Sequence, residues 1–217
     1  MNILYRQLKT GDRLAEENYK QLAGLIYDTD PYIYPALFGC RKNALKLLPE
    51  LIRGSDPMFD LRNIFAAISD GGIVGLVLWK QGPLAWNPEL LYQCLAALKI
   101  EPGKYIEDVM DRYFSSYREV RDDTVSIINV CVDSSLRGHG IGRDLLNCFL
   151  NETSDICKNY ELFVLTDNEP AIMLYREYGF EITEELPGYN SDPEPVTCYR
   201  MVKNVTNETI TADYLQT

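Results

Sequence analysis

The sequence predicts a mixed α/β fold, a twisted sheet of six or seven strands with helices on both faces. Three observations support this prediction. Residues 125–132 are apolar and β-branched, as in a strand, whereas apolar residues recur at helical spacing over residues 145–150. Residues 161–166 are a second short apolar run, and the helix predicted after them holds Pro170 in its first turn. Asp-Gly-Gly at 70–72 predicts a hairpin between two further strands.

The N-terminal third of the chain alternates between strand and helix patterns. A segment with two prolines separates its two helical regions, and Pro49 starts a new turn in the second region or kinks it. The predicted order is a strand at 4–8, a helix at 12–27, a break at 28–39, a helix at 43–53, and hairpin strands at 63–69 and 73–80.

Residues 82–123 are expected to form a helical insertion between strands of the sheet. Helices are predicted at 88–100 and 104–118, and the second carries an apolar stripe too long to leave in water. This stripe is a lid over a pocket, a subunit contact or a cover for the protein's own sheet. A subunit contact would make a homodimer, and otherwise a monomer is expected.

The C-terminal part is expected to close the sheet with an antiparallel pair of strands. A loop rich in Pro, Gly and Asn separates the two strands, and the last residues lack any sustained period. We therefore predict strands at 180–184 and 196–202, a single domain over residues 1–203, and a tail at 204–217.

The composition argues against several classes of function. Lys and Arg number 21 against 32 Asp and Glu, and this net charge of −11 disfavours nucleic-acid binding and favours a cationic partner. There is no apolar leader and no apolar run of 18 residues, so we expect a cytoplasmic protein that does not enter membranes. The six cysteines lack metal-ligand spacing and His139 is the only histidine, so no metal site is expected.

A glycine-rich turn follows the strand at 125–132, with the sequence Arg137-Gly138-His139-Gly140-Ile141-Gly142. The first turn of a helix has unpaired N–H groups and a partial positive charge, and glycine lets a phosphate approach them closely. The turn therefore predicts an anion site. A Walker loop does not fit because Gly-Lys-Ser/Thr is missing, and a dinucleotide fingerprint is disfavoured because the glycines are spaced two by two.

The same turn resembles the pyrophosphate-binding signature of the GNAT superfamily of acetyl-CoA-dependent N-acetyltransferases, Arg/Gln-x-x-Gly-x-Gly/Ala. Arg137, Gly140 and Gly142 fill its defined positions, and an ordinary strand-to-helix connection is the alternative for this motif alone. A later stretch resembles the other GNAT signature, N-x-x-A-x-x-L-Y-x-x-x-G-F. Its defined positions are Asn168, Ala171, Leu174, Tyr175, Gly179 and Phe180.

The resemblance implies a GNAT-like acyl-CoA N-acyltransferase fold, in which two parallel strands splay apart and admit acetyl-CoA between them. Backbone groups of the first strand would bind the pantetheine chain, and amides of the glycine-rich turn would wrap the pyrophosphate. His139 is expected to act there as a spacer, and Asn168 either contacts the cofactor or caps a helix. The implied cofactor contacts are Val130, Cys131, Val132, Arg137, Gly138, His139, Gly140, Ile141, Gly142, Arg143 and Asn168.

The resemblance also implies a reaction, the direct attack of an amine on the thioester within a ternary complex. Tyr175 matches the family's proton donor to the departing sulfur, and ordinary aromatic packing is its alternative role. The general base is unassigned, because Glu161 falls near the end of its predicted strand and no other carboxylate lies in either splayed strand. Asp28, Asp30, a carboxylate of the late loop, or a water chain are the candidates, unless the acceptor arrives neutral.

The acceptor amine is expected to bind beside residues 28–39, which border the acceptor pocket in this family. The aromatic residues there, Tyr32, Tyr34 and Phe38, either wall a site for a cationic amine or pack the loop down. Two other classes of function remain open at this point. One is a non-catalytic acyl-CoA-binding or regulatory domain, and the other is a nucleotide-binding oxidoreductase, which the glycine spacing disfavours.

Overall fold

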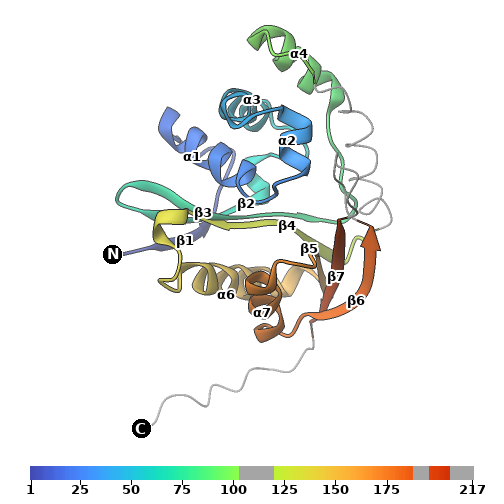
Figure 1. Cartoon of the computed structure of the whole chain (residues 1–217). Coiled ribbons are helices and arrows are strands. Elements are labelled where there is room, and N and C mark those ends of the chain that lie inside the picture. The colour runs from blue at the N-terminus through green and yellow to red at the C-terminus, as the bar shows by residue number, and fades with distance from the viewer. Residues whose placement is uncertain (103–119, 188–195, 206–217) are drawn as a thin grey trace.

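The computed structural model describes residues 1–102, 120–187 and 196–205, and its strands form one seven-stranded sheet in the order β1-β2-β3-β4-β5-β7-β6. Neighbouring strands are antiparallel except for the parallel pair β4 and β5. Helices cover both faces of the sheet, as Figure 1 shows. The predicted mixed α/β fold is confirmed.

Strand and helix bounds follow the predicted order with shifts of a few residues. The strands are β1 (Leu4–Gln7), β2 (Ile64–Ser69), β3 (Gly72–Gln81), β4 (Thr124–Val132), β5 (Asn159–Leu165), β6 (Glu181–Pro187) and β7 (Thr197–Asn204). The helices are α1 (Glu16–Tyr27), α2 (Ile33–Phe38), α3 (Arg41–Arg53), α4 (Pro88–Leu98), α6 (Ile141–Thr153) and α7 (Glu169–Glu177), with single 3₁₀ turns at Leu61–Asn63, Ser134–Leu136 and Ser154–Ile156.

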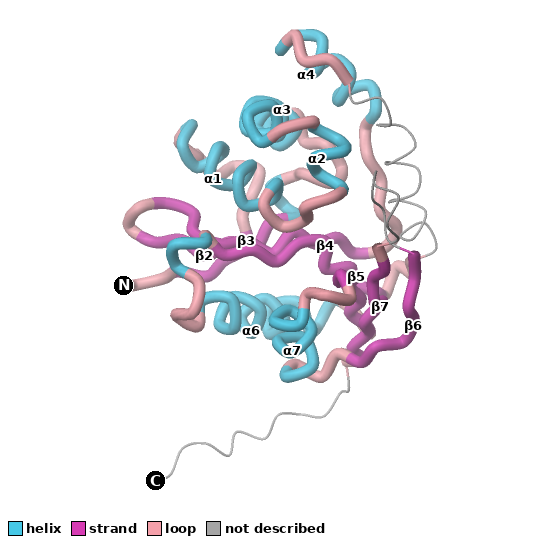
Figure 2. The backbone as a smooth tube through the Cα atoms, viewed as in Figure 1, coloured by secondary structure: helices cyan, strands magenta, loops and turns pink. Residues whose placement is uncertain are grey.

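Three helical layers can be followed in Figure 2: α1 to α3 over one face of the sheet, α4 beyond α3, and α6 with α7 under the opposite face. The sheet therefore separates two hydrophobic cores. In the second core the Phe149 ring lies 5.6 Å from Trp79 and 5.8 Å from Phe65, centroid to centroid. Burying one such side chain contributes about 1.5–3 kcal/mol, so these cores hold the sheet and both helical layers together.

Three local features differ from the sequence prediction, each for a visible reason. Helix α1 begins at Glu16 instead of residue 12, because the Asp12 carboxylate accepts hydrogen bonds from Arg6 and from Lys9 N–H in the preceding turn. Pro49 lies buried inside α3 without ending the helix. Within the predicted break, α2 forms because Asp30 Oδ1 accepts hydrogen bonds from the N–H groups of Tyr32 and Ile33, both at 2.7 Å.

The predicted insertion is only partly visible. Helix α4 contributes Leu91 and Leu95 to the core beneath α1 and α3, so this half of the segment covers the protein's own fold. The helix predicted at 104–118, most of the loop after 186 and the tail after 205 lie outside the described residues. The single domain over residues 1–203 therefore stays a proposal. Among the described residues, no helix is long and apolar enough to cross a membrane.

Candidate functional site

Strands β4 and β5 diverge after a short parallel ladder. They pair from Thr124↔Asn159 to Ile127↔Leu162, whereas β4 continues to Val132 beside β3 and β5 continues to Leu165 beside β7. We call this divergence the β4/β5 notch, bounded by residues 128–132 of β4 and 163–165 of β5. It forms the parallel, splayed arrangement that the sequence predicts.

Backbone groups of β4 face the notch at alternate residues. Asp133 N–H donates a hydrogen bond to the carbonyl of Val74 in β3. Cys131 lies two residues earlier, opposite Leu76, so its backbone groups also point toward β3. In an antiparallel ladder the intervening residues turn their N–H and C=O groups away from that partner. Val130 and Val132 therefore present theirs to the notch, while the backbone of Cys131, a predicted cofactor contact, faces β3.

The Arg137 side chain folds back onto the end of β4. Its Nε donates to the Val132 carbonyl at 3.0 Å, and its guanidinium reaches Cys131 Sγ at 4.0 Å. The head group is therefore held against the end of the strand. This bond also occupies the Val132 carbonyl, so Val130 keeps the free carbonyl on this side of the notch.

The glycine-rich turn has the backbone conformation that the motif requires. Gly138 and Gly140 have φ of 80° and 81°, in the region that L side chains rarely adopt. A Cβ at either position would meet no atom within 4 Å, so the space above the turn is open. Helix α6 starts with Gly140 as its N-cap, and its first N–H groups point out from the helix end. These features suit a phosphate group.

Side chains around this turn are engaged with the protein itself. His139 Nδ1 lies 3.0 Å from the Arg137 carbonyl, consistent with a spacer. Arg143 pairs with Glu177 at 2.8 Å, and its carbonyl accepts a hydrogen bond from Tyr178. The charge of Arg143 is therefore partly neutralised, which leaves backbone amides as the principal anion-binding groups.

Helix α7 carries two of the predicted site residues. Asn168 caps the helix, because its Oδ1 accepts from Ala171 N–H at 3.3 Å. Tyr175 is 8% exposed and packs at 60° against Phe180, with 5.8 Å between ring centroids. Among the described residues nothing hydrogen-bonds its hydroxyl group. Burial, with the nearby Cys131 thiol, raises the Tyr175 pKa, so the phenol stays protonated well beyond neutral pH.

A chain of buried hydrogen bonds connects β4 to the segment between α1 and α2. Tyr34 OH donates to Asn129 Oδ1 at 2.6 Å, Asn129 Nδ2 donates to Thr29 Oγ1 at 2.6 Å, and Thr29 donates to the Ile26 carbonyl. Asn129 lies past Ile127, the last β4 residue paired with β5. The segment is therefore fastened inside the notch region.

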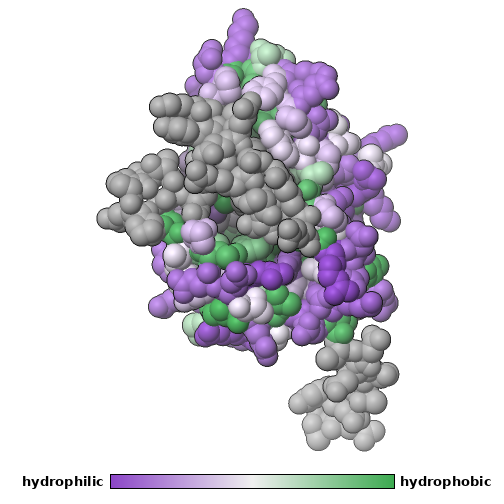
Figure 3. Space-filling view, turned by 90° about the vertical axis from the view of Figure 1, so that its right-hand side faces the viewer, coloured by the Kyte–Doolittle hydropathy of each residue, from purple (hydrophilic) through white to green (hydrophobic). Residues whose placement is uncertain are grey.

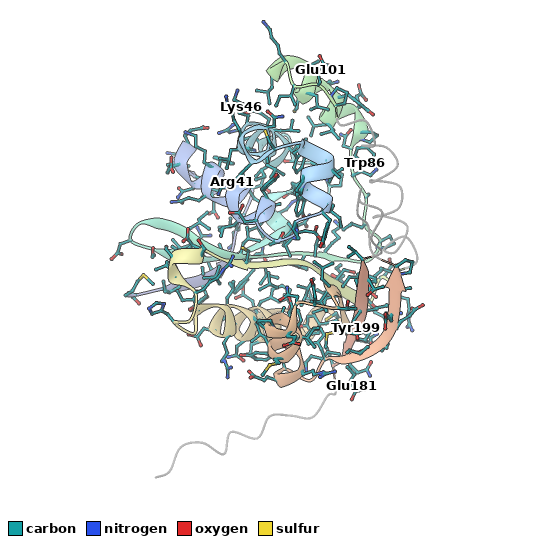
Figure 4. The ribbon with its side chains drawn as sticks, viewed as in Figure 1. Arg41, Lys46, Trp86, Glu101, Glu181 and Tyr199 are labelled. Carbon is teal, nitrogen blue, oxygen red and sulfur yellow. The ribbon has the colours of Figure 1, made fainter. Side chains whose placement is uncertain are left out.

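Three carboxylates lie on this face of the sheet. Glu161 is buried, accepting from Ser126 Oγ at 2.9 Å and from Arg200 at 2.8 Å. The sequence placed Glu161 near a strand end, but β5 begins at Asn159 because its ladder with β4 and β7 extends that far. Both carboxylate oxygens of Asp28 accept hydrogen bonds from the Arg41 guanidinium. Figure 4 shows Arg41 in the helical layer over the sheet. Asp30 Oδ1 accepts hydrogen bonds from the N–H groups of Tyr32 and Ile33.

Part of the chain is similar in sequence to known acetyltransferases. Residues 105–182 match the family model of the acetyltransferase (GNAT) domain. Over 68 residues the chain is 37% identical to the L-amino acid N-acetyltransferase AaaT of Escherichia coli (strain K12), a match that covers 29% of this chain and 40% of that relative.

Solved structures extend the likeness to nearly the whole chain. An N-acetyltransferase from Staphylococcus aureus Mu50 superimposes with a TM-score of 0.62 at 18% identity, covering 92% of this chain and 100% of that one. Arabidopsis thaliana Naa50 in complex with the bisubstrate analogue CoA-Ac-MVNAL gives a TM-score of 0.51 at 21% identity, covering 94% and 99%. The protein thus has the fold of N-acetyltransferases. The match of residues 105–182 to the GNAT domain model confirms the resemblance that the two motifs predicted.

Among the described residues, no cluster of three or more His, Cys, Asp or Glu side chains has metal-binding geometry. The six cysteines all have free thiols. Burial raises the pKa of Cys131, whose thiol lies at the notch, although the Arg137 guanidinium partly opposes that shift. Its thiol therefore stays protonated at neutral pH.

Proposed function

We propose that this protein is an acetyl-CoA-dependent N-acetyltransferase that acts on an amine by direct attack within a ternary complex. The observation that carries the proposal is the β4/β5 notch, which is followed by the open glycine turn. The Tyr175 phenol is close enough to Cys131 of β4 for the thiol to influence its pKa. The match to the E. coli L-amino acid N-acetyltransferase covers only 40% of that relative, so activity is inferred from the site together with the match.

Each part of the notch has a role in this proposal. Acetyl-CoA would supply the thioester, and Val130 would bind its pantetheine arm through backbone N–H and C=O groups. The N–H groups of residues 138–143 would hold the pyrophosphate, where a Cβ at Gly140 would intrude. Arg137 would position the end of β4 and contribute positive charge. Asn168 fixes the start of α7, which carries Tyr175.

Tyr175 is proposed as the proton donor to the departing thiolate. Its raised pKa keeps the proton on oxygen at neutral pH, and its hydroxyl lacks a hydrogen-bond partner among the described residues. Packing against Phe180, which follows the end of α7, orients the Tyr175 ring. A protonated, oriented phenol is suited to general acid catalysis.

The acceptor is proposed to be a small-molecule amine or a peptide amino group, cationic in solution. Two comparisons support this class: the E. coli relative is named for L-amino acids, and the Arabidopsis protein binds an analogue that includes a peptide. The net charge of −11 favours a cationic acceptor. The free thiols fit the reducing cytoplasm that we propose as its location, and light scattering would distinguish a monomer from a homodimer.

The test is release of free CoA thiol with a panel of polyamines, aminoglycosides, amino acids and peptides. Turnover with at least one amine, and mass-spectrometric detection of its acetylated product, is the expected result. The second candidate is a non-catalytic acyl-CoA-binding domain, which is favoured by Glu161 being engaged through both oxygens. Tight acetyl-CoA binding by calorimetry without turnover would favour that candidate, and no binding would contradict both.

A further inference from the structure

The segment of residues 28–33 joins α1 to α2 and is attached to β4 at Asn129, beyond the last β4 residue that pairs with β5. Asp28, at the start of this segment, is close enough to β4 for its charge to raise the pKa of the Cys131 thiol. The charge of Asp30 instead raises the pKa of the Cys198 thiol. Cys198 is the β7 residue opposite Leu165, at the end of β5. Between the two, Thr29 is hydrogen-bonded to Asn129 of β4. Asp30 therefore directly follows the residue that is attached to β4, and its charge reaches β7, the strand beside β5.

Of the three carboxylates on this face, Asp30 alone has an oxygen without a donor among the described residues. Its Oδ1 accepts from the N–H groups of Tyr32 and Ile33, which fixes the orientation of the carboxylate. No described group donates to Oδ2. Glu161 and Asp28 each use both oxygens on neighbouring donors. An oxygen without a donor is the one most open to an incoming ammonium group, and on this face, within the part of the chain that the structure describes, that oxygen is Asp30 Oδ2.

We propose that Asp30 is the general base that removes a proton from the acceptor's ammonium group. The proposal rests on the proposed acetyl transfer and assigns the residue that the sequence left open. An ammonium nitrogen brings three protons. One passes to Asp30 Oδ2 and then to water, one stays on the product amide, and one leaves nitrogen as the N–C bond forms and the C–S bond breaks, balancing the proton that the thiolate receives.

The surroundings of Asp30 suit this role. Burial raises the pKa of Asp30, although the two backbone hydrogen bonds oppose the shift. A more basic carboxylate accepts a proton from an ammonium group more readily. Among the described residues, the Asp30 charge acts on the thiol of Cys198 from β7, and no Lys or Arg forms an ion pair with Asp30. Its negative charge therefore attracts a cationic acceptor.

The test compares Asp30→Asn with the wild type over acceptors of different ammonium pKa. Asn keeps the Oδ1 acceptor that starts α2 but cannot take the proton. With an alkyl amine of pKa about 10, kcat/KM at pH 7 should fall by about 100-fold. With an amine that is already neutral at the assay pH, the loss should shrink below about tenfold. Acetyl-CoA affinity by calorimetry should stay within about twofold.

A matched control is Asp56→Asn. Asp56 is also buried with a raised pKa, and its Oδ1 also accepts from backbone N–H groups two and three residues on, but it follows α3, away from the notch. This variant should lower stability without any dependence of activity on acceptor pKa. Equal losses for protonated and neutral amines in Asp30→Asn, or no loss, would overturn the Asp30 assignment alone. A wild-type protein inactive on every amine would instead overturn the proposed function, and this assignment with it.

Discussion

The Tyr34 hydroxyl donates a 2.6 Å hydrogen bond to Asn129 Oδ1, joining helix α2 to strand β4 across 95 positions of sequence. Asn129 passes the connection on to Thr29 through its amide group. The side chain at the middle of β4 is therefore structural and holds the acceptor-side segment against the notch.

This connection makes Tyr34→Phe informative. Removing the hydroxyl leaves Asn129 Oδ1 buried without its donor, which should lower the free energy of unfolding by about 1–3 kcal/mol. Because the segment carrying Asp30 loses its support, the KM for the acceptor should rise more than the KM for acetyl-CoA. Urea unfolding and steady-state kinetics measure the two effects. Tyr19→Phe is the control, since the Tyr19 ring packs under Arg53 on the outer helices. Equal changes in both KM values would contradict the assigned position.

Gly140→Ala tests the anion site. The backbone φ of 81° is unfavourable for Ala, so stability should fall by about 1–2 kcal/mol, while the added methyl group meets no protein atom. The methyl group would occupy the space assigned to the pyrophosphate, so the acetyl-CoA Kd should rise by about tenfold or more. Calorimetry measures this. Gly11→Ala, with equally open space and an ordinary φ, should leave the Kd unchanged. Unaltered affinity in Gly140→Ala would place the phosphates elsewhere.

Arg200→Met tests whether the Glu161 ion pair is structural. Glu161 is 2% exposed, and loss of Arg200 leaves the buried carboxylate with Ser126 as its remaining donor, so stability should fall by about 1–3 kcal/mol. Arg62→Met removes an ion pair whose arginine side chain is 71% exposed, and should lower stability less. Denaturant unfolding compares the two. A smaller loss for Arg200→Met than for Arg62→Met would show that Glu161 finds other donors.

The sequence was sufficient for the fold class and for the order of elements from residue 125 to 180. Those predictions depended on local signals: the glycine turn, the helix cap at Asn168 and the change of hydrophobic period. Contacts distant in sequence had no such signal. The β5 start at Asn159 depends on its ladder with β7, and the Tyr34–Asn129 bond depends on how α2 lies over β4. Nothing in the local sequence around Asp30 indicates which carboxylates acquire donors.

The acceptor side differs from the cofactor side in the same way. Arg137 and the turn after it are fixed by residues close in sequence, whereas the proposed acceptor surface combines the segment at 28–33 with β7. Figure 3 looks at the side of the molecule where β6 and β7 lie, and it shows hydrophobic residues near the middle of a largely hydrophilic face. Acceptor identity therefore depends on several elements that no single motif describes.

Thiol release by the wild type and by Tyr175→Phe, measured from about pH 6 to about pH 10 with one active amine, tests the central proposal most directly. We predict that the variant binds acetyl-CoA normally, releases thiol about 100-fold more slowly, and that the wild-type rate shows no basic limb below about pH 10, because burial raises the Tyr175 pKa. Tyr19→Phe, whose ring packs under Arg53 on the outer helices, should behave as wild type. An active Tyr175→Phe with an unchanged rate would contradict the role of Tyr175 as proton donor.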